Sequence, residues 1–189
     1  MQTFQSVALA APVSKIQVMT MTPAHRARRV AIVTCHSLRN LAYYRNGWQQ
    51  RTLVRNDEFW RTVNGNFIDI CVIEWCKLFG DVRGKHSWRK VFCNSQAFST
   101  GLLADMQMSP SEFDNYIKKM RAYRDNFVVH LDDFPTMDIP DLDFAKKSLF
   151  YLYNCLAAIE NDVVFPQGFP ITASAYFCQS SDEATKGYL

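Results

Sequence analysis

The segment YRDNFVVH, residues 123–130, combines a permanent cation with a side chain that titrates near neutral pH. Arg124 is the charged member of an otherwise apolar stripe at helical spacing, and His130 follows it by six positions. Because a guanidinium keeps its proton in a protein, an arginine on a core-facing stripe needs an anionic partner. That partner is either an internal carboxylate, such as Glu74, or a phosphate that the guanidinium binds through two parallel hydrogen bonds.

His130 would supply acid–base chemistry beside that cation. An imidazole with an ordinary pKa of about 6.5 takes up and releases a proton near neutral pH, as general acid–base catalysis requires. On an ideal helix, a step of six residues separates the two side chains by roughly 9 Å along the axis and roughly 120° around it. They could flank one phosphodiester if the helix loosens through Val128 and Val129. Asn126 lies one turn before His130 on the same face, where its amide could fix the imidazole tautomer.

The spacing of these residues resembles a motif of a known family. Arg124, the polar Asp125, four further residues and His130 match the Arg-polar-x(4)-His form of the R-x(4–6)-H motif of HEPN domains, which are all-helical proteins of prokaryotic defence and toxin systems. The flanking words YRDNFVVHLDD, EWCKLFG and HSWRKVF look like the abortive-infection branch of that superfamily. The resemblance covers roughly residues 23–162.

The resemblance implies a metal-independent endoribonuclease that acts as a toxin or abortive-infection effector. Its active site would form where the subunits of a homodimer meet, and it would use neither a cofactor nor a metal ion. Arg124 would be the phosphate clamp, His130 the acid/base, and Asp125 would orient a neighbour by hydrogen bonding. RNA and a cognate antitoxin protein are the partners that such a system implies. The chain departs from part of the family at residues 131–133, Leu-Asp-Asp, because HEPN proteins paired with a minimal nucleotidyltransferase carry a tyrosine shortly after the histidine.

The chemistry of RNA is consistent with this interpretation. The 2′-hydroxyl can attack its own phosphorus, so cleavage needs a base for that proton, an acid for the leaving 5′-oxygen and positive charge near the phosphorane. One chain supplies a single histidine in the motif, whereas a symmetric dimer brings both copies of the histidine and the arginine into one cleft. DNA lacks the 2′-hydroxyl, so RNA is the expected substrate.

A second stretch, residues 83–92 (RGKHSWRKVF), interleaves basic and aromatic side chains. It could form a stacking and phosphate-binding surface for single-stranded RNA. The residues of that candidate surface are Arg83, Lys85, His86, Trp88 and Arg89. The alternative, which is the commoner use of such a stretch, is an amphipathic helix over 86–94 that buries its aromatic side chains. Residues 1–68 also carry nine Lys and Arg against two acidic residues, which indicates either a basic surface for a polyanion or solvated helix backs.

Composition places the chain among globular proteins. Of its 189 residues, 48% are hydrophobic and 21% are charged, so bulk disorder is excluded. No uncharged and predominantly apolar run reaches the roughly 18 residues of a membrane span, so we expect no membrane partner. The six cysteines are scattered and form no CxxC pair. They predict neither a disulfide framework nor a metal site, and they favour a cytoplasmic location.

Helical periodicity and start signals predict a single-domain, all-α bundle of four or five helices. A flexible lead-in over 1–22 would precede a helical domain over 23–162. Thr22 is the expected cap of the first helix and Asn56 the start signal of the second. The helices expected in that domain are 23–46, a buried helix from about 57 to 79, a shorter one over 86–94, one that starts at the capping box Ser109-Pro110-Ser111-Glu112, and a last one over 144–159. Residues 99–108 would form a link, and 163–189 an extended C-terminal tail.

Two other interpretations remain open at the level of sequence. The chain could be a catalytically inactive HEPN-like module that binds RNA or a protein through its basic N-terminal helices. It could also be a purely structural bundle in which Arg124 pairs with Glu74, and replacing both by apolar residues would then preserve stability.

Overall fold

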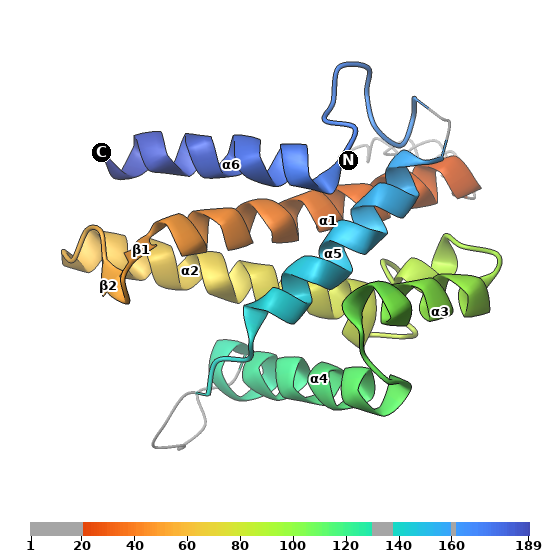
Figure 1. The fold of residues 1–189 in the computed structure, drawn as a ribbon, viewed down its shortest axis with the longest axis horizontal. Helices are drawn as coiled ribbons and strands as arrows, with labels where there is room; N and C mark the ends of the chain where they lie inside the picture. The colour runs from red at the N-terminus through yellow and green to blue at the C-terminus, as the bar shows by residue number, and fades with distance from the viewer. Residues whose placement is uncertain (1–20, 130–137, 160–161) are drawn as a thin grey trace, which may run out of the picture.

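The computed structural model describes residues 21–129, 138–159 and 162–189, and over these residues the chain is an all-α bundle, as predicted (Figure 1). The expected four or five helices are six in the described part of the chain, and a short hairpin joins the first two. The elements are α1 (Pro23–Asn46), β1 (Trp48–Gln49), β2 (Thr52–Leu53), α2 (Glu58–Trp75), the π-helical η1 (Cys76–Gly80), the 3₁₀ turn η2 (Trp88–Lys90), α3 (Ser95–Met106), α4 (Pro110–Tyr123), the π-helical η3 (Arg124–Val129), α5 (Leu142–Ala157) and α6 (Ala173–Tyr188).

The helices begin at side chains that accept hydrogen bonds from the free N–H groups of the first turn. Thr22 caps α1, and Ser109 with Glu112 forms the complete capping box at the start of α4, both as predicted. The cap of α2 is Asp57, one residue later than the predicted Asn56. Because a cap of this kind stabilises a helix by about 1 kcal/mol, these positions define where the elements start.

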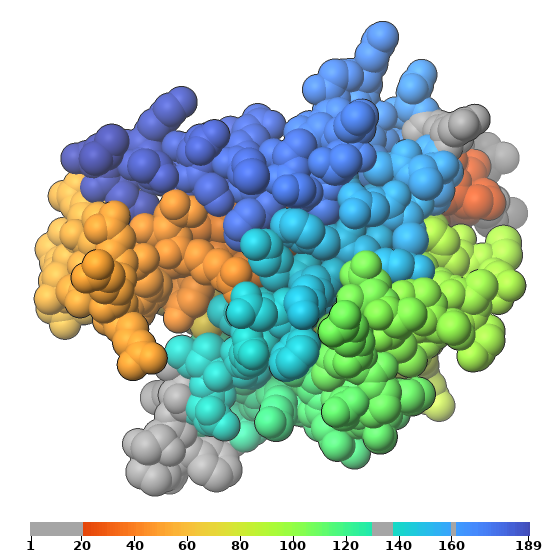
Figure 2. Space-filling view, viewed as in Figure 1, coloured from red at the N-terminus to blue at the C-terminus, as the bar shows by residue number. Residues whose placement is uncertain are grey.

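The helices are arranged around the pair α1 and α2, which lie side by side along the long axis of the molecule (Figure 1). α6 lies along α1 on the side away from α4, and α5 crosses α1 and continues the core towards α3 (Figure 1). In the space-filling view the side chains of α6 lie directly against those of α1 (Figure 2). The first and last helices of the described chain are therefore neighbours.

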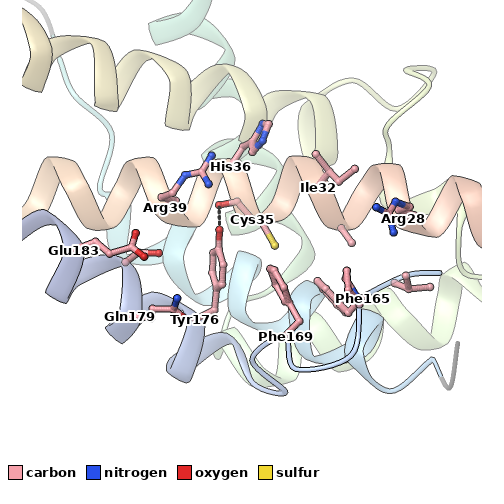
Figure 3. Close-up of a pocket in the computed structure, with 14 residues that line it drawn as sticks. Arg28, Ile32, Cys35, His36, Arg39, Phe165, Phe169, Tyr176, Gln179 and Glu183 are labelled. Atoms are coloured by element: carbon pink, nitrogen blue, oxygen red, sulfur yellow. Dashed lines mark hydrogen bonds between the residues drawn. The ribbon is translucent and has the colours of Figure 1, made fainter. Parts of the chain in front are cut away.

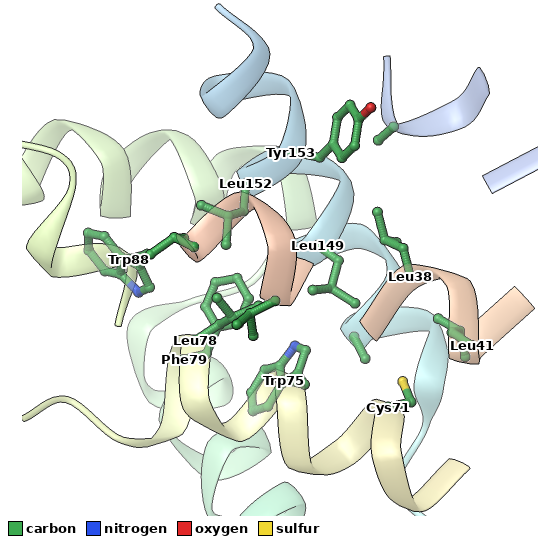
Figure 4. Close-up of a cluster of buried hydrophobic side chains, with 14 of the residues drawn as sticks. Leu38, Leu41, Cys71, Trp75, Leu78, Phe79, Trp88, Leu149, Leu152 and Tyr153 are labelled. Carbon is green, nitrogen blue, oxygen red and sulfur yellow. The ribbon is translucent and has the colours of Figure 1, made fainter. Parts of the chain in front are cut away.

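The core is centred on the C-terminal end of α2. Trp75 and Phe79 stack with ring centroids 5.1 Å apart, and Leu149 and Leu152 of α5 pack in the same buried cluster (Figure 4). The indole N–H of Trp75 donates to the hydroxyl of Ser148 over 2.9 Å, so its polar atom is satisfied in the interior. Each large apolar side chain buried in this way contributes roughly 1.5–3 kcal/mol. This cluster fixes the point at which α2 turns into the π-helical η1.

Two predicted elements between α2 and α4 are wrong. Residues 99–108, expected to form a link, belong mostly to α3, whose buried side chains are Phe98, Leu102 and Met106. The helix expected over 86–94 is reduced to the single turn η2. Trp88 is inserted between α3 and the core instead, which holds its segment against the bundle without a long helix.

The C-terminal tail is also not extended throughout. Residues 163–172 are irregular, as their prolines and glycine predict, but α6 starts after the cap Thr172. Its buried residues Ala173, Tyr176, Ser180, Ala184 and Tyr188 recur at helical spacing and face α1. Three of them are small or polar, so the buried face of the helix is hardly more hydrophobic than its exposed face.

A buried polar residue of α2 joins the hairpin to the C-terminal ends of α1 and α6 by hydrogen bonds. Asn64 accepts from the indole N–H of Trp48 at 2.9 Å and donates to the hydroxyl of Tyr188 at 2.9 Å and the carbonyl of Tyr44 at 3.2 Å. Gly47, which ends α1, packs so closely on this amide that a Cβ there would lie 1.9 Å from Asn64 Nδ2. Within the three described ranges, no helix is both long and apolar enough to span a membrane.

Candidate active site

Two π-helical segments meet at Arg124, the arginine of the predicted motif. α2 widens into η1 over its last turn, and the N–H of Asp81 closes that turn on the carbonyl of Cys76 at 2.8 Å. α4 widens into η3 at Arg124 itself, and η3 extends through Val128 and Val129, where the sequence left a loosening of the helix open. π-helical turns are rare and occur often at functional sites, because the wider turn redirects side chains and frees backbone groups. This junction is therefore a candidate functional site.

Arg124 is held there by two carboxylates. Its Nη1 donates to both carboxylate oxygens of Asp81, at 3.0 and 3.1 Å, and its Nε donates to Asp125 at 2.8 Å. The side chain is 16% exposed, whereas those of Asp81 and Asp125 are 38% and 48% exposed. The hydrogen bonds that the guanidinium donates, to Asp125 first and to Asp81, raise its pKa above the usual value, against the opposing effect of burial. The cation is thus partly buried and fixed in orientation, while its anionic partners lie nearer the surface.

The carboxylate suggested from the sequence is not the partner. Glu74 accepts a hydrogen bond from Lys77 at 3.0 Å, one turn further along the same helix. Asp81 takes its place because it directly follows Gly80, where η1 ends and the chain turns towards α4. The predicted alternative of an internal acid pairing with Arg124 is therefore realised, but with Asp81 and Asp125.

A second arginine lies at the same junction. Arg121, one turn before Arg124, is exposed, and its side-chain stem lies against Gly80. It forms no ion pair within the part of the chain that the structure describes. Arg121, Arg124, Asp81 and Asp125 all lie close enough to the thiol of Cys76 to influence its pKa. The four side chains form one cluster in which positive and negative charges balance.

The other motif residues are only partly described. Asp125 orients a neighbour by hydrogen bonding, and that neighbour is Arg124. Asn126 is half-buried in η3. His130 lies outside the described residues, so its distance from Arg124 and its hydrogen bond with Asn126 remain predictions.

The elements that carry the charged cluster also expose apolar side chains. Val82, directly after Asp81, is 51% exposed, and Val129, at the end of η3, is 59% exposed. Ile70 on α2 is 41% exposed, and α2 contacts η3. Large apolar residues next to a fixed ion pair are typical of surfaces that another molecule covers.

The candidate RNA-binding stretch is brought together only in part. Arg83, Lys85 and Arg89 are exposed and His86 is half-buried, but Trp88 is 2% exposed. Its ring stacks on Phe98 with centroids 4.3 Å apart, because η2 packs on α3. The prediction that Trp88 offers a stacking face to a base is therefore wrong, and the alternative of a buried tryptophan is correct. The outer side of its ring is taken by the guanidinium of Arg89, 4.6 Å from the centroid.

Other reactive side chains near the junction are unsuited to catalysis. Burial raises the pKa of the Cys76 thiol to about 12, so it is neutral and a poor nucleophile near pH 7. Among the described residues, no three His, Cys, Asp or Glu side chains are grouped so as to hold a metal ion.

Comparisons of the chain with protein-family models, with curated proteins and with solved structures found no match.

Proposed function

We propose that this chain is a metal-independent endoribonuclease of the HEPN type that works as a homodimer, as an effector of a toxin or abortive-infection system. The observation that carries the proposal is the state of Arg124. Two of its nitrogens are engaged by Asp81 and Asp125, and Nη2 forms no hydrogen bond within the described residues. A guanidinium that two carboxylates hold in orientation, and whose Nη2 is left to donate, is suited to bind a phosphate oxygen, because little side-chain freedom is lost on binding.

The charge balance of the site explains how an anionic substrate could approach. Arg124 alone, between two aspartates, would repel RNA. Arg121 adds an exposed guanidinium beside it, and its side chain has no ion pair within the described residues. In the proposed reaction both arginines stabilise charge on the phosphorane, while His130 of one subunit accepts the 2′-hydroxyl proton and His130 of the other protonates the leaving 5′-oxygen.

The apolar surface around the junction supports a dimer. Val82 and Val129 lie beside the charged cluster, and packing them against a second copy would remove them from water. It would also enclose the arginines, so that their interactions with phosphate would act at a lower dielectric constant. Pairing about a two-fold axis through this surface supplies the second histidine that the mechanism needs.

The test is RNA cleavage in the presence of EDTA. The purified protein should cut single-stranded RNA and leave 2′,3′-cyclic phosphate ends, with no cleavage of DNA. His130→Ala should abolish cutting while the dimer persists in gel filtration, and Arg124→Lys should reduce it at least about tenfold, because lysine keeps the charge but loses the planar fork. His25→Ala, which changes an exposed histidine at the start of α1, is the matched control and should cut as the wild type does. Equal activity of the wild type and His130→Ala would overturn the assignment.

One observation favours a second candidate, a catalytically inactive module that binds RNA or a protein. Arg124 is already neutralised by acids of its own chain, as it would be in a purely structural role. This candidate predicts that wild-type protein retains RNA in a gel shift, leaves it intact and is unaffected by His130→Ala. The same set of variants therefore distinguishes the two functions.

A further inference from the structure

A separate pocket lies between α1, α6 and the irregular segment that precedes α6. It encloses about 360 Å³ and is lined on one side by α1, on another by α6 and at one end by residues 164–169 (Figure 3). α6 and α4 lie on opposite sides of α1 in the fold (Figure 1), and none of the residues that line this pocket belongs to η1, α4 or η3, the elements around Arg124. Its volume is in the range of sites that bind small organic molecules.

One wall of the pocket is a fixed array of aromatic rings. Phe165 and Phe169 stack with centroids 5.3 Å apart, and Phe169 stacks on Tyr176 at 5.5 Å. Tyr153 supports them from the core, with centroids 4.8 Å from Phe165 and 5.7 Å from Tyr176. Because each ring is held by its neighbours and Phe165 and Phe169 are only half-buried, their exposed parts offer a preformed surface for a planar apolar group.

The two ends of the pocket differ in charge. Arg28 stands at one end, where its Nη1 donates to the carbonyl of Val163 at 3.0 Å, and it forms no ion pair within the described ranges. Arg39 stands at the other end beside Glu183, which accepts from the hydroxyl of Tyr43 at 3.1 Å (Figure 3). The carboxylate of Glu183 offsets Arg39, so the Arg28 end is the more attractive to an anion.

Between the two arginines, α1 lines the pocket with Ile32, Cys35 and His36 (Figure 3). Ile32 is 43% exposed and lies between the two arginines along α1 (Figure 3). Burial raises the pKa of the Cys35 thiol to about 12, so it does not act as a nucleophile or as a charge at neutral pH. The ligand is therefore bound without covalent chemistry.

We propose that this pocket binds a small organic anion with a flat aromatic body. The ring system lies along Phe165 and Phe169, and the acidic group accepts hydrogen bonds from the nitrogens of Arg28 that Val163 leaves available. This inference does not rest on the proposed ribonuclease activity, because it uses none of the residues assigned to cleavage.

The test uses a pair of fluorescent probes that differ in charge. Anilinonaphthalene sulfonate has an aromatic body and an anionic group, and N-phenylnaphthylamine has a similar body without the charge. The folded protein should bind the sulfonate more tightly and its melting temperature should rise in its presence, because a ligand of the native state stabilises that state. Arg28→Gln should weaken sulfonate binding by roughly three- to tenfold, the loss expected for one charge-assisted hydrogen bond at a partly exposed site, and leave the neutral probe unchanged.

Two further variants complete the test. Arg29→Gln removes the neighbouring exposed arginine, which does not line the pocket, and should bind both probes as the wild type does. Ile32→Trp fills the pocket from a partly exposed position and should weaken the binding of both probes. The proposal is overturned if Arg28→Gln and Arg29→Gln have equal effects, if Ile32→Trp binds normally, or if the sulfonate lowers the melting temperature of the wild type.

Discussion

The ion pair of Arg124 with Asp81 allows a quantitative test of how the junction of the π-helical segments is held. Nη1 lies 3.0 and 3.1 Å from the two oxygens of Asp81. At this distance the attraction of two unit charges is about 1.4 kcal/mol in bulk water and several times larger in a protein interior. Because Asp81 is 38% exposed, solvent screening reduces the interior value, and we expect a net coupling of about 1–2 kcal/mol.

A double-mutant cycle measures this coupling. Urea denaturation of wild type, Arg124→Met, Asp81→Asn and the double variant should give an interaction free energy of about 1–2 kcal/mol, and Asp81→Asn alone should lower the melting temperature by roughly 2–5 °C for a chain of this size. The exposed pair Arg45 and Asp143 is the control, since its carboxylate is 69% exposed, and its coupling should stay below about 1 kcal/mol. A coupling at Arg124 within about 0.3 kcal/mol of zero would show that the guanidinium is not held by Asp81 in solution, and the argument for a fixed phosphate clamp would be lost.

Three other predictions follow from the packing. Gly47→Ala should destabilise the fold by about 1–3 kcal/mol because the new methyl group meets Asn64, whereas Gly65→Ala, in α2 with open space around it, should be neutral or stabilising by up to about 1 kcal/mol; thermal denaturation compares them. Burial raises the pKa of the Asp69 carboxyl, with the hydrogen bond from Tyr123 acting in the opposite direction, so the folded state keeps this proton to higher pH than the unfolded chain. The wild type therefore loses stability as the pH rises from 3.8, the ordinary pKa of the carboxyl, through the raised pKa of the folded state. Above that pH window Asp69→Asn should have a larger free energy of unfolding than the wild type, and below it the two should be equal. A thiol reagent should label the exposed Cys93 and Cys178 of the native protein fast. It should reach the buried cysteines, which are Cys35, Cys71 and Cys76, only after unfolding. Fast labelling of any buried cysteine in the native protein would contradict the described packing.

Local signals predicted those parts of the fold that local physics determines. The caps Thr22 and Ser109 mark helix starts because they satisfy backbone N–H groups within one turn. α6 was missed because its buried stripe contains Ala173, Ser180 and Ala184, whose burial depends on how closely α1 approaches and not on their own hydrophobicity.

The sequence identified the cation of the candidate site but not its carboxylate partner on the neighbouring element. The cost of an unpaired guanidinium required an anionic partner for Arg124, and of the two kinds that the sequence left open, carboxylates of the same chain are present. The identity of the distant carboxylate could not be read from the sequence, since Asp81 lies 43 positions away and reaches Arg124 only because η1 and α4 pack together. The signal that could have pointed to Asp81 is its place directly after Gly80, where a predicted helix ends and a side chain is free to turn back.

The adjacency of α1 and α6 also has a consequence during protein synthesis. The hydroxyl of Tyr188 donates to the carbonyl of Tyr43, 145 positions earlier, so the contacts that cover one face of α1 come from a helix that leaves the ribosome after the other described helices. Until α6 has emerged, one face of α1 in the nascent chain stays exposed. The chain then depends on chaperones or on rapid completion of folding to avoid aggregation with other chains. A polypeptide interrupted before residue 173 would be expected to aggregate or be degraded instead of persisting as a smaller folded protein.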